Sequence, residues 1–126
     1  MAKTILIIDD DEAFTESLKD VLESKSYNIL TADSGIKGFD KAKSEQPDLI
    51  LLDVMMTDFS EGLDIALKLE KSEETKNIPV IIVTGIDRPQ KLFDKFAPGE
   101  KWSNVKKNLE KTIQPEELLQ AIAELI

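Results

Sequence analysis

The stretch Asp48-Leu49-Ile50-Leu51-Leu52-Asp53 decides the fold, because four consecutive apolar residues end on a carboxylate. Pro47 precedes the stretch, and we expect a polar loop over residues 57–62 after it. A short apolar run with these limits is typical of a strand covered on both faces, in the middle of a parallel sheet. Ligands of open parallel sheets bind at the carboxyl ends of the strands. We therefore predict that Asp53 lies at a functional site.

Four further segments have the composition of strands: residues 4–9, 27–32, 78–84 and 105–113. Residues 4–9 and 78–84 are nearly unbroken apolar runs, which places them beside residues 48–53 in the centre of a sheet. Residues 27–32 alternate in polarity, and residues 105–113 are weakly apolar and rich in lysine. These two segments are expected at the edges.

Apolar residues at helical spacing predict a helix in each connection and after the last strand. Asp11 and Glu12 suit the cap and first turn of the first helix, and Pro115 suits the start of the last one. The expected inward residues of the intervening helices are Ile36, Phe39 and Ala42 in the second, Leu63, Ala66 and Leu67 in the third, and Leu92, Phe93 and Phe96 in the fourth.

Strands that alternate with helices predict an α/β fold, a doubly wound five-stranded parallel sheet with helices on both faces. Three central strands and two edge strands give the strand order 2-1-3-4-5, with its switch point between the first and third strands. Asp9, Asp10 and Asp53 should therefore converge on one crevice. A length of 126 residues suits a single domain, residues 1–126.

The composition excludes several classes of function. The chain has no cysteine and no histidine, which excludes disulfides, thiolate metal sites and catalysis by imidazole. A formal net charge of −9 disfavours direct binding of nucleic acid, because phosphates are repelled. The amino-terminal apolar run is too short for a signal peptide or a membrane span. We expect a cytoplasmic protein that does not bind membranes and whose partners are proteins.

The acidic residues at the strand ends indicate the chemistry. Three neighbouring carboxylates repel one another, so a hard divalent cation, Mg²⁺, would hold them together. A carboxylate oxygen of Asp53 could then attack phosphorus and form an aspartyl phosphate. Lys111 and Thr84 would suit a second cation and a hydroxyl donor at that site.

Four segments, taken together and in order, resemble the receiver domain of the response regulators of two-component signalling: Ile7-Ile8-Asp9-Asp10, Leu51-Leu52-Asp53-Val54-Met55-Met56, Val83-Thr84-Gly85 and the run from Lys111 to Leu118. The resemblance covers essentially the whole chain and implies the flavodoxin-like fold of the chemotaxis regulators. It implies that Asp9, Asp10 and the backbone carbonyl of Met55 serve Mg²⁺, together with Asp53. It also implies that Asp53 accepts the phosphoryl group, while Thr84 and Lys111 contact it.

Several positions depart from the pattern of that family. Thr57 and Thr112 each stand where the family usually has proline, and Gly62 comes one residue late. Asn108 occupies the usual place of the aromatic switch residue, and the segment 98–104 is longer than the usual connection. These departures leave open how the domain would switch.

The first hypothesis is a receiver that takes a phosphoryl group from a histidine kinase or phosphotransfer protein and then changes its affinity for an unknown output protein. It would not be an enzyme beyond catalysing its own phosphorylation and dephosphorylation. The alternative is a degenerate receiver that binds proteins without phosphorylation. A Mg²⁺-dependent phosphatase would want an acid at Met55, and a flavin phosphate would be repelled by Asp9 and Asp10. The sequence leaves open the kinase, the signal, the oligomeric state, and whether this is a whole regulator or a piece of one.

Overall fold

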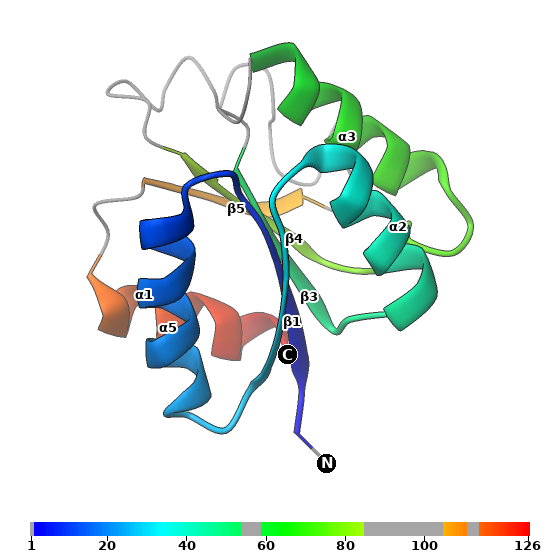
Figure 1. Cartoon of the computed structure of the whole chain (residues 1–126). Coiled ribbons are helices and arrows are strands. Elements are labelled where there is room, and N and C mark those ends of the chain that lie inside the picture. The colour runs from blue at the N-terminus through cyan, green and yellow to red at the C-terminus, as the bar shows by residue number, and fades with distance from the viewer. Residues whose placement is uncertain (1, 54–58, 85–104, 111–113) are drawn as a thin grey trace.

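Five parallel strands form one sheet in the order β2-β1-β3-β4-β5. The structure, a computed structural model, describes residues 2–53, 59–84, 105–110 and 114–126. The strands are β1 (Thr4–Ile8), β2 (Asn28–Ala32), β3 (Leu49–Leu52), β4 (Val80–Thr84) and β5 (Val105–Glu110) (Figure 1). The predicted strand order, with β2 and β5 at the edges, is confirmed.

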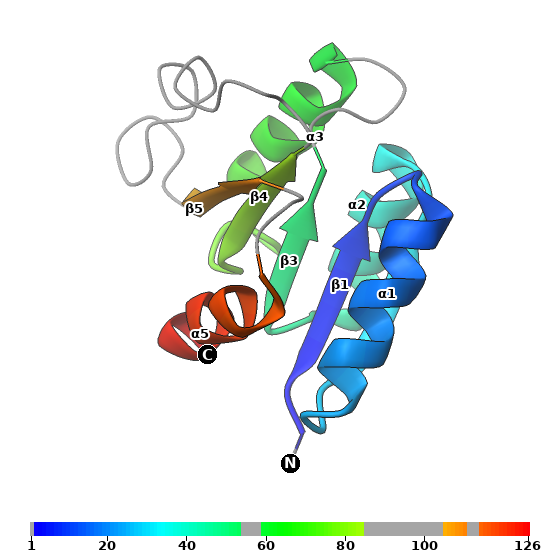
Figure 2. The ribbon, with the colours of Figure 1, turned by 90° about the vertical axis from the view of Figure 1, so that its left-hand side faces the viewer.

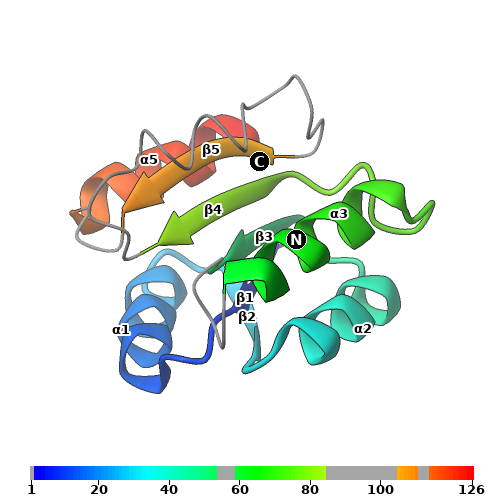
Figure 3. The ribbon, with the colours of Figure 1, turned by 90° about the horizontal axis from the view of Figure 1, so that it is seen from above.

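Helices cover both faces of the sheet, as predicted. They are α1 (Glu12–Glu23), α2 (Gly35–Glu45), α3 (Phe59–Lys71) and α5 (Pro115–Leu125). Viewed from above, α1 and α5 lie on one face and α2 and α3 on the other (Figure 3). The helix predicted around residues 92–96 lies outside the described residues.

The central strands are buried on both faces, which explains their unbroken apolar sequences. In β1, Ile5 and Ile7 pack toward α1 and α5, whereas Leu6 and Ile8 pack toward α2 and α3. All four residues of β3 are likewise buried. Side chains of a strand alternate between faces, so a strand covered on both sides needs apolar residues at every position.

The ends of α1 and α5 agree with the sequence analysis. Asp11 is the N-cap of α1, and its side chain accepts a hydrogen bond from the backbone N–H of Phe14 at 3.1 Å. Glu12 lies in the first turn, and α5 begins with Pro115. The predicted cap of α1 and start of α5 are confirmed.

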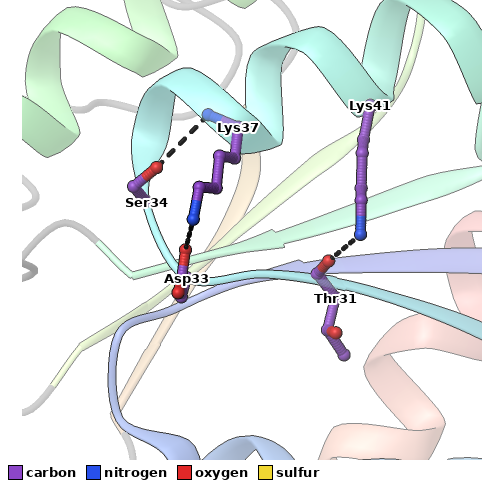
Figure 4. A network of polar contacts seen from close by, with 5 residues as sticks. All are labelled: Thr31, Asp33, Ser34, Lys37 and Lys41. Atoms are coloured by element: carbon purple, nitrogen blue, oxygen red, sulfur yellow. Dashed lines mark hydrogen bonds and ion pairs between the residues drawn. The ribbon is translucent and has the colours of Figure 1, made fainter.

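The predicted inner face of α2 is wrong at one position. Ile36 is 68% exposed, whereas Gly35, Gly38 and Ala42 are buried. Packing against β1 sets this orientation, because Gly38 lies against Ile8, whereas Ser34 Oγ only caps the first turn by accepting from the backbone N–H of Lys37 at 3.3 Å (Figure 4). Ile36 therefore lies one step around the helix from the buried line, where two glycines take the place of larger side chains.

Two predicted boundaries also change. The helix α3 already begins at Phe59, so the expected loop over residues 57–62 is wrong from Phe59 onward, and Gly62 lies in the first turns of the helix. Farther along α3, Ile65, Ala66 and Leu69 are fully or almost fully buried, while Leu67 is only half-buried. The strand β5 ends at Glu110 within the described part, and residues 111–113 lie outside it.

The edge strand β2 is partly covered by a lysine of α2. The Lys41 Nζ donates to the backbone carbonyl of Thr31, and Lys37 pairs with Asp33 at 3.1 Å (Figure 4). A lysine over an edge strand hinders pairing with another chain. In addition, no helix in the described ranges combines the length and the apolar character that a membrane crossing requires.

Candidate functional site

The pairing of β1 with β3 places two acids side by side. Ile8 pairs with Leu52 in parallel register, and Asp9 and Asp53 are the next residues of the two strands. The backbone N–H of Asp53 donates to the carbonyl of Ile8 at 2.9 Å. Both strands point to the same edge of the sheet (Figure 2), so both carboxylates lie where a parallel sheet binds its ligands.

The predicted acidic cluster is formed. Asp9, Asp10 and Asp53 each offer a carboxylate oxygen, and these three oxygens lie within 4.8 Å of one another. Asp9 and Asp53 are only 5% and 2% exposed, whereas Asp10 is exposed. The backbone N–H of Asp11 donates to Asp9 Oδ1 at 2.8 Å, which fixes the orientation of that carboxylate at the start of α1.

The donor atoms of this cluster fit Mg²⁺. All three are carboxylate oxygens, the ligand type that this hard cation prefers, and two of them are held by buried side chains. Mg²⁺ usually keeps several waters and takes only a few carboxylates from the protein, so the exposed side of the cluster suits it. The described residues contain no second cluster of three or more acids this close together.

The remaining predicted site residues are only partly covered by the structure. The backbone of Thr84 ends β4, two residues beyond the partner of Leu52, and pairs with Glu110. Lys111 follows Glu110 in the sequence but lies outside the described residues, as does Met55. Lys107, a neighbouring lysine of β5, forms an ion pair with Glu124 of α5 at 2.5 Å.

The departures from the family pattern are mostly not covered either. Thr57, Thr112 and the segment 98–104 lie outside the described residues. Asn108 lies in β5, where its backbone pairs with Ile82 of β4.

Asp9 and Asp10 of the cluster line a hollow of about 340 Å³ between α1 and the end of β2. Beyond Asp9 and Asp10, its lining includes residues that the sequence analysis did not assign to the site: Glu12, Thr15, Glu16, Thr31, Ala32 and Asp33. Asp33 directly follows the last residue of β2, so its place at the carboxyl edge of the sheet could have been read from the sequence. The hollow is acidic, and cations rather than anions would gather there without a bound metal.

A larger hollow, of about 460 Å³, adjoins the first on the side of α2. Its lining includes Lys37 and Lys41, whose ammonium groups contact Asp33 and the Thr31 carbonyl. Its size does not make it the reactive site, because none of the clustered carboxylates lines it, whereas Asp9 and Asp10 line the smaller hollow.

The strand order and the acidic cluster at the switch point of the sheet fit the class of signal receiver domains, and sequence comparison agrees. Residues 5–123 match the family model of the response regulator receiver domain. The chain belongs to this family.

Individual relatives support the assignment. The chain is 36% identical over 84 residues to the polar-differentiation response regulator DivK of Brucella ovis, a match that covers 67% of this chain and 68% of that protein. It is 30% identical to a CheY-like receiver domain protein from Methanospirillum hungatei JF-1, with a TM-score of 0.81 over 98% of this chain and 93% of that one. A putative response regulator from Chloroflexus aurantiacus, 23% identical with a TM-score of 0.86, shows the same fold over 99% of this chain and 98% of its own.

Proposed function

We propose that the domain accepts a phosphoryl group on Asp53 from a histidine kinase or phosphotransfer protein and thereby changes its affinity for an output protein. The observation that carries this proposal is the cluster of Asp9, Asp10 and Asp53, whose oxygens lie within 4.8 Å of one another at the ends of β1 and β3. The cluster lies at the switch point of the sheet, between the strands where the chain reverses its direction of winding.

Asp9, Asp10 and Asp53 would hold Mg²⁺, together with the backbone carbonyl of Met55. Mg²⁺ bound there would neutralise part of the charge on the carboxylates and on the phosphoryl oxygens. Without this neutralisation, the acidic residues around Asp53 would repel the donor.

The proposed transfer uses the carboxylate of Asp53 as the nucleophile. One of its oxygens bonds to phosphorus while the P–N bond of the donor's phosphohistidine breaks, and the imidazole nitrogen keeps the electron pair. Thr84 would donate a hydrogen bond to a phosphoryl oxygen, and Lys111 would pair with the charge that remains. The protein would thus act on itself and on no other substrate.

The proposal also covers the cellular location of the domain and the kind of partner that it binds. We place the domain in the cytoplasm, where its phosphodonors act, and we expect protein partners. The net charge of −9 supports protein partners over direct contact with nucleic acid. The degenerate receiver, which would bind partners without phosphorylation, is the outcome that the following experiment separates from the proposal.

The decisive experiment measures intact mass after incubation with Mg²⁺ and acetyl phosphate. The expected result is one added phosphoryl group, which disappears in Asp53→Asn and when Mg²⁺ is withheld. Asp48→Asn is the matched control, because Asp48 lies at the opposite end of the same strand and accepts a hydrogen bond from the Thr4 N–H at 2.8 Å. No adduct on the wild-type protein, despite measurable Mg²⁺ binding, would favour the degenerate receiver.

A further inference from the structure

Gly38 lies where the helix α2 packs tightly against β1, the strand that leads into Asp9. A Cβ atom built on Gly38 would lie 2.5 Å from Cδ1, 2.6 Å from Cγ1 and 2.9 Å from Cγ2 of Ile8. These distances are far shorter than the ordinary separation of about 3.5–4.0 Å between carbon atoms in contact. Even the smallest side chain at position 38 would therefore require Ile8 or α2 to move.

Ile8 has little freedom to move away. Its side chain is fully buried in the layer between the sheet and the helices α2 and α3. Isoleucine branches at Cβ, so rotation of the side chain is restricted, and three of its atoms meet the added Cβ rather than one flexible end. A methyl group at position 38 would thus displace Ile8 as a whole.

The helix α2 is also held in place on the C-terminal side of Gly38. Lys41 donates to the backbone carbonyl of Thr31 in β2 (Figure 4). At the end of the helix, Gln46 Nε2 donates to the carbonyl of Glu74 in the connection after α3 at 2.8 Å. An outward shift of α2 would strain both contacts.

Movement of Ile8 would reach the acidic cluster directly. Asp9 is the next residue, and its N–H donates to the carbonyl of Ala32 at 3.0 Å. The carbonyl of Ile8 accepts from the N–H of Asp53 at 2.9 Å. Ile8 thus links the backbones that carry the two buried carboxylates.

We infer that Gly38 is a positioning residue for the metal site: the contact between Gly38 and Ile8 sets the spacing of the Asp9 and Asp53 carboxylates. This inference rests on the proposed function only where it predicts metal affinity. Alanine is a better helix former than glycine, so helix propensity alone would favour Gly38→Ala. A harmful effect of this substitution would therefore come from the contact and not from the helix.

Two measurements test the inference. In calorimetric titrations, Gly38→Ala should raise the Kd for Mg²⁺ at least fivefold. In the metal-free protein, hydrogen exchange of the Asp53 N–H should accelerate relative to that of the Asp48 N–H. The Asp48 N–H is a suitable reference because it donates to the backbone carbonyl of Thr4 at 2.8 Å, at the other end of the same pair of strands. A uniform loss of stability would accelerate both exchange rates by the same factor, so it cancels in their ratio.

Ala42→Gly is the control for helix stability, because Ala42 is buried on the same face of α2 one turn farther along. It should leave the Kd within twofold of the wild-type value. A Kd within twofold and an unchanged exchange ratio in Gly38→Ala would overturn the inference. If the wild-type protein bound no Mg²⁺, the proposed function would fail, and the exchange ratio alone would decide the positioning role.

A second pair of variants covers the case in which Gly38→Ala does not fold. Ile8→Ala removes the three atoms that would lie nearest to the new Cβ, and it leaves a cavity. In Ile8→Ala/Gly38→Ala the added methyl lies in that cavity, so both the Kd and the exchange ratio should return toward the wild-type values. The inference would be contradicted if the Kd and the exchange ratio of the double variant were no closer to the wild-type values than those of Ile8→Ala.

Discussion

Asp10 and Asp11 are adjacent and exposed, yet they have different structural roles. Asp10 contributes its carboxylate to the cluster with Asp9 and Asp53, whereas Asp11 caps α1 through the backbone N–H of Phe14. Only one of the two side chains therefore belongs to the proposed metal site. The acidic run in the sequence does not by itself separate these roles, but the position of each residue relative to the strand and the helix does.

This difference predicts opposite effects of two matched substitutions. Asp10→Ala should weaken Mg²⁺ binding by tenfold or more. In the metal-free protein it should stabilise the fold by about 1 kcal/mol, because a like charge leaves the cluster. Asp11→Ala should destabilise the fold by about 1 kcal/mol through loss of the cap and leave Mg²⁺ affinity within twofold. Urea unfolding and calorimetric titration measure both quantities, and equal losses of affinity in the two variants would contradict the assignment.

Sequence analysis identified the acidic residues of the site, and the structure confirms that Asp9, Asp10 and Asp53 converge. Their position after buried apolar strands was sufficient, because parallel strands end at a common edge. The contribution of Gly38 was not visible in the sequence. A glycine inside a helix has many possible reasons, and the close approach of Ile8 depends on how α2 is docked against β1.

At the scale of elements, the end of α2 depends on a residue with an unusual backbone conformation. Gln46 adopts a left-handed conformation, with φ 50° and ψ 60°. Its Nε2 donates to the carbonyls of Ala42, Lys43 and Glu74 at 3.2, 3.1 and 2.8 Å. One side chain therefore closes the last turn of α2 and joins it to the segment after α3.

Two substitutions at Gln46 separate backbone conformation from hydrogen bonding. Gln46→Ala and Gln46→Gly both lose the side-chain bonds, but only glycine adopts the left-handed region without steric cost. We expect Gln46→Ala to be less stable than Gln46→Gly by about 1 kcal/mol in urea unfolding. The same comparison at Ser26, with φ 69°, should give a difference of the same sign. Equal stability of the alanine and glycine variants at both positions would argue against this explanation.

The helix α2 also shows why element-level prediction failed in detail. Its existence followed from the sequence, but its inner face was misassigned at Ile36. The apolar pattern favoured large residues inside. The close approach of α2 to β1 instead places Gly38 against Ile8, and the larger Ile36 lies outside.

At the scale of the whole molecule, metal binding should be visible as stability. A ligand that binds only the folded state at 100 times its Kd stabilises that state by about 2.7 kcal/mol. For a domain of this length, we expect Mg²⁺ to raise Tm by on the order of 10 °C. Differential scanning calorimetry at increasing Mg²⁺ concentrations measures the shift.

The control for this prediction is sodium chloride at matched ionic strength. With a net charge of −9, general screening also stabilises the compact state, so only the excess over sodium chloride reports the site. In Asp10→Ala the excess should fall by half or more, because a tenfold loss of affinity already lowers the stabilisation from about 2.7 to about 1.4 kcal/mol. A shift of equal size in sodium chloride would mean that no specific site contributes.

The sequence by itself determined the alternation of strands and helices, the strand order and the acidic residues at the carboxyl ends of β1 and β3. These features follow from hydrophobic patterns, which record burial on one face or on both. Only the tertiary structure decided which face of α2 is buried, that α3 already begins at Phe59, and that Gly38 meets Ile8 beneath the cluster. The rotation of a helix and the distance at which it packs are set by the side chains of both partners together, and no local pattern contains that information.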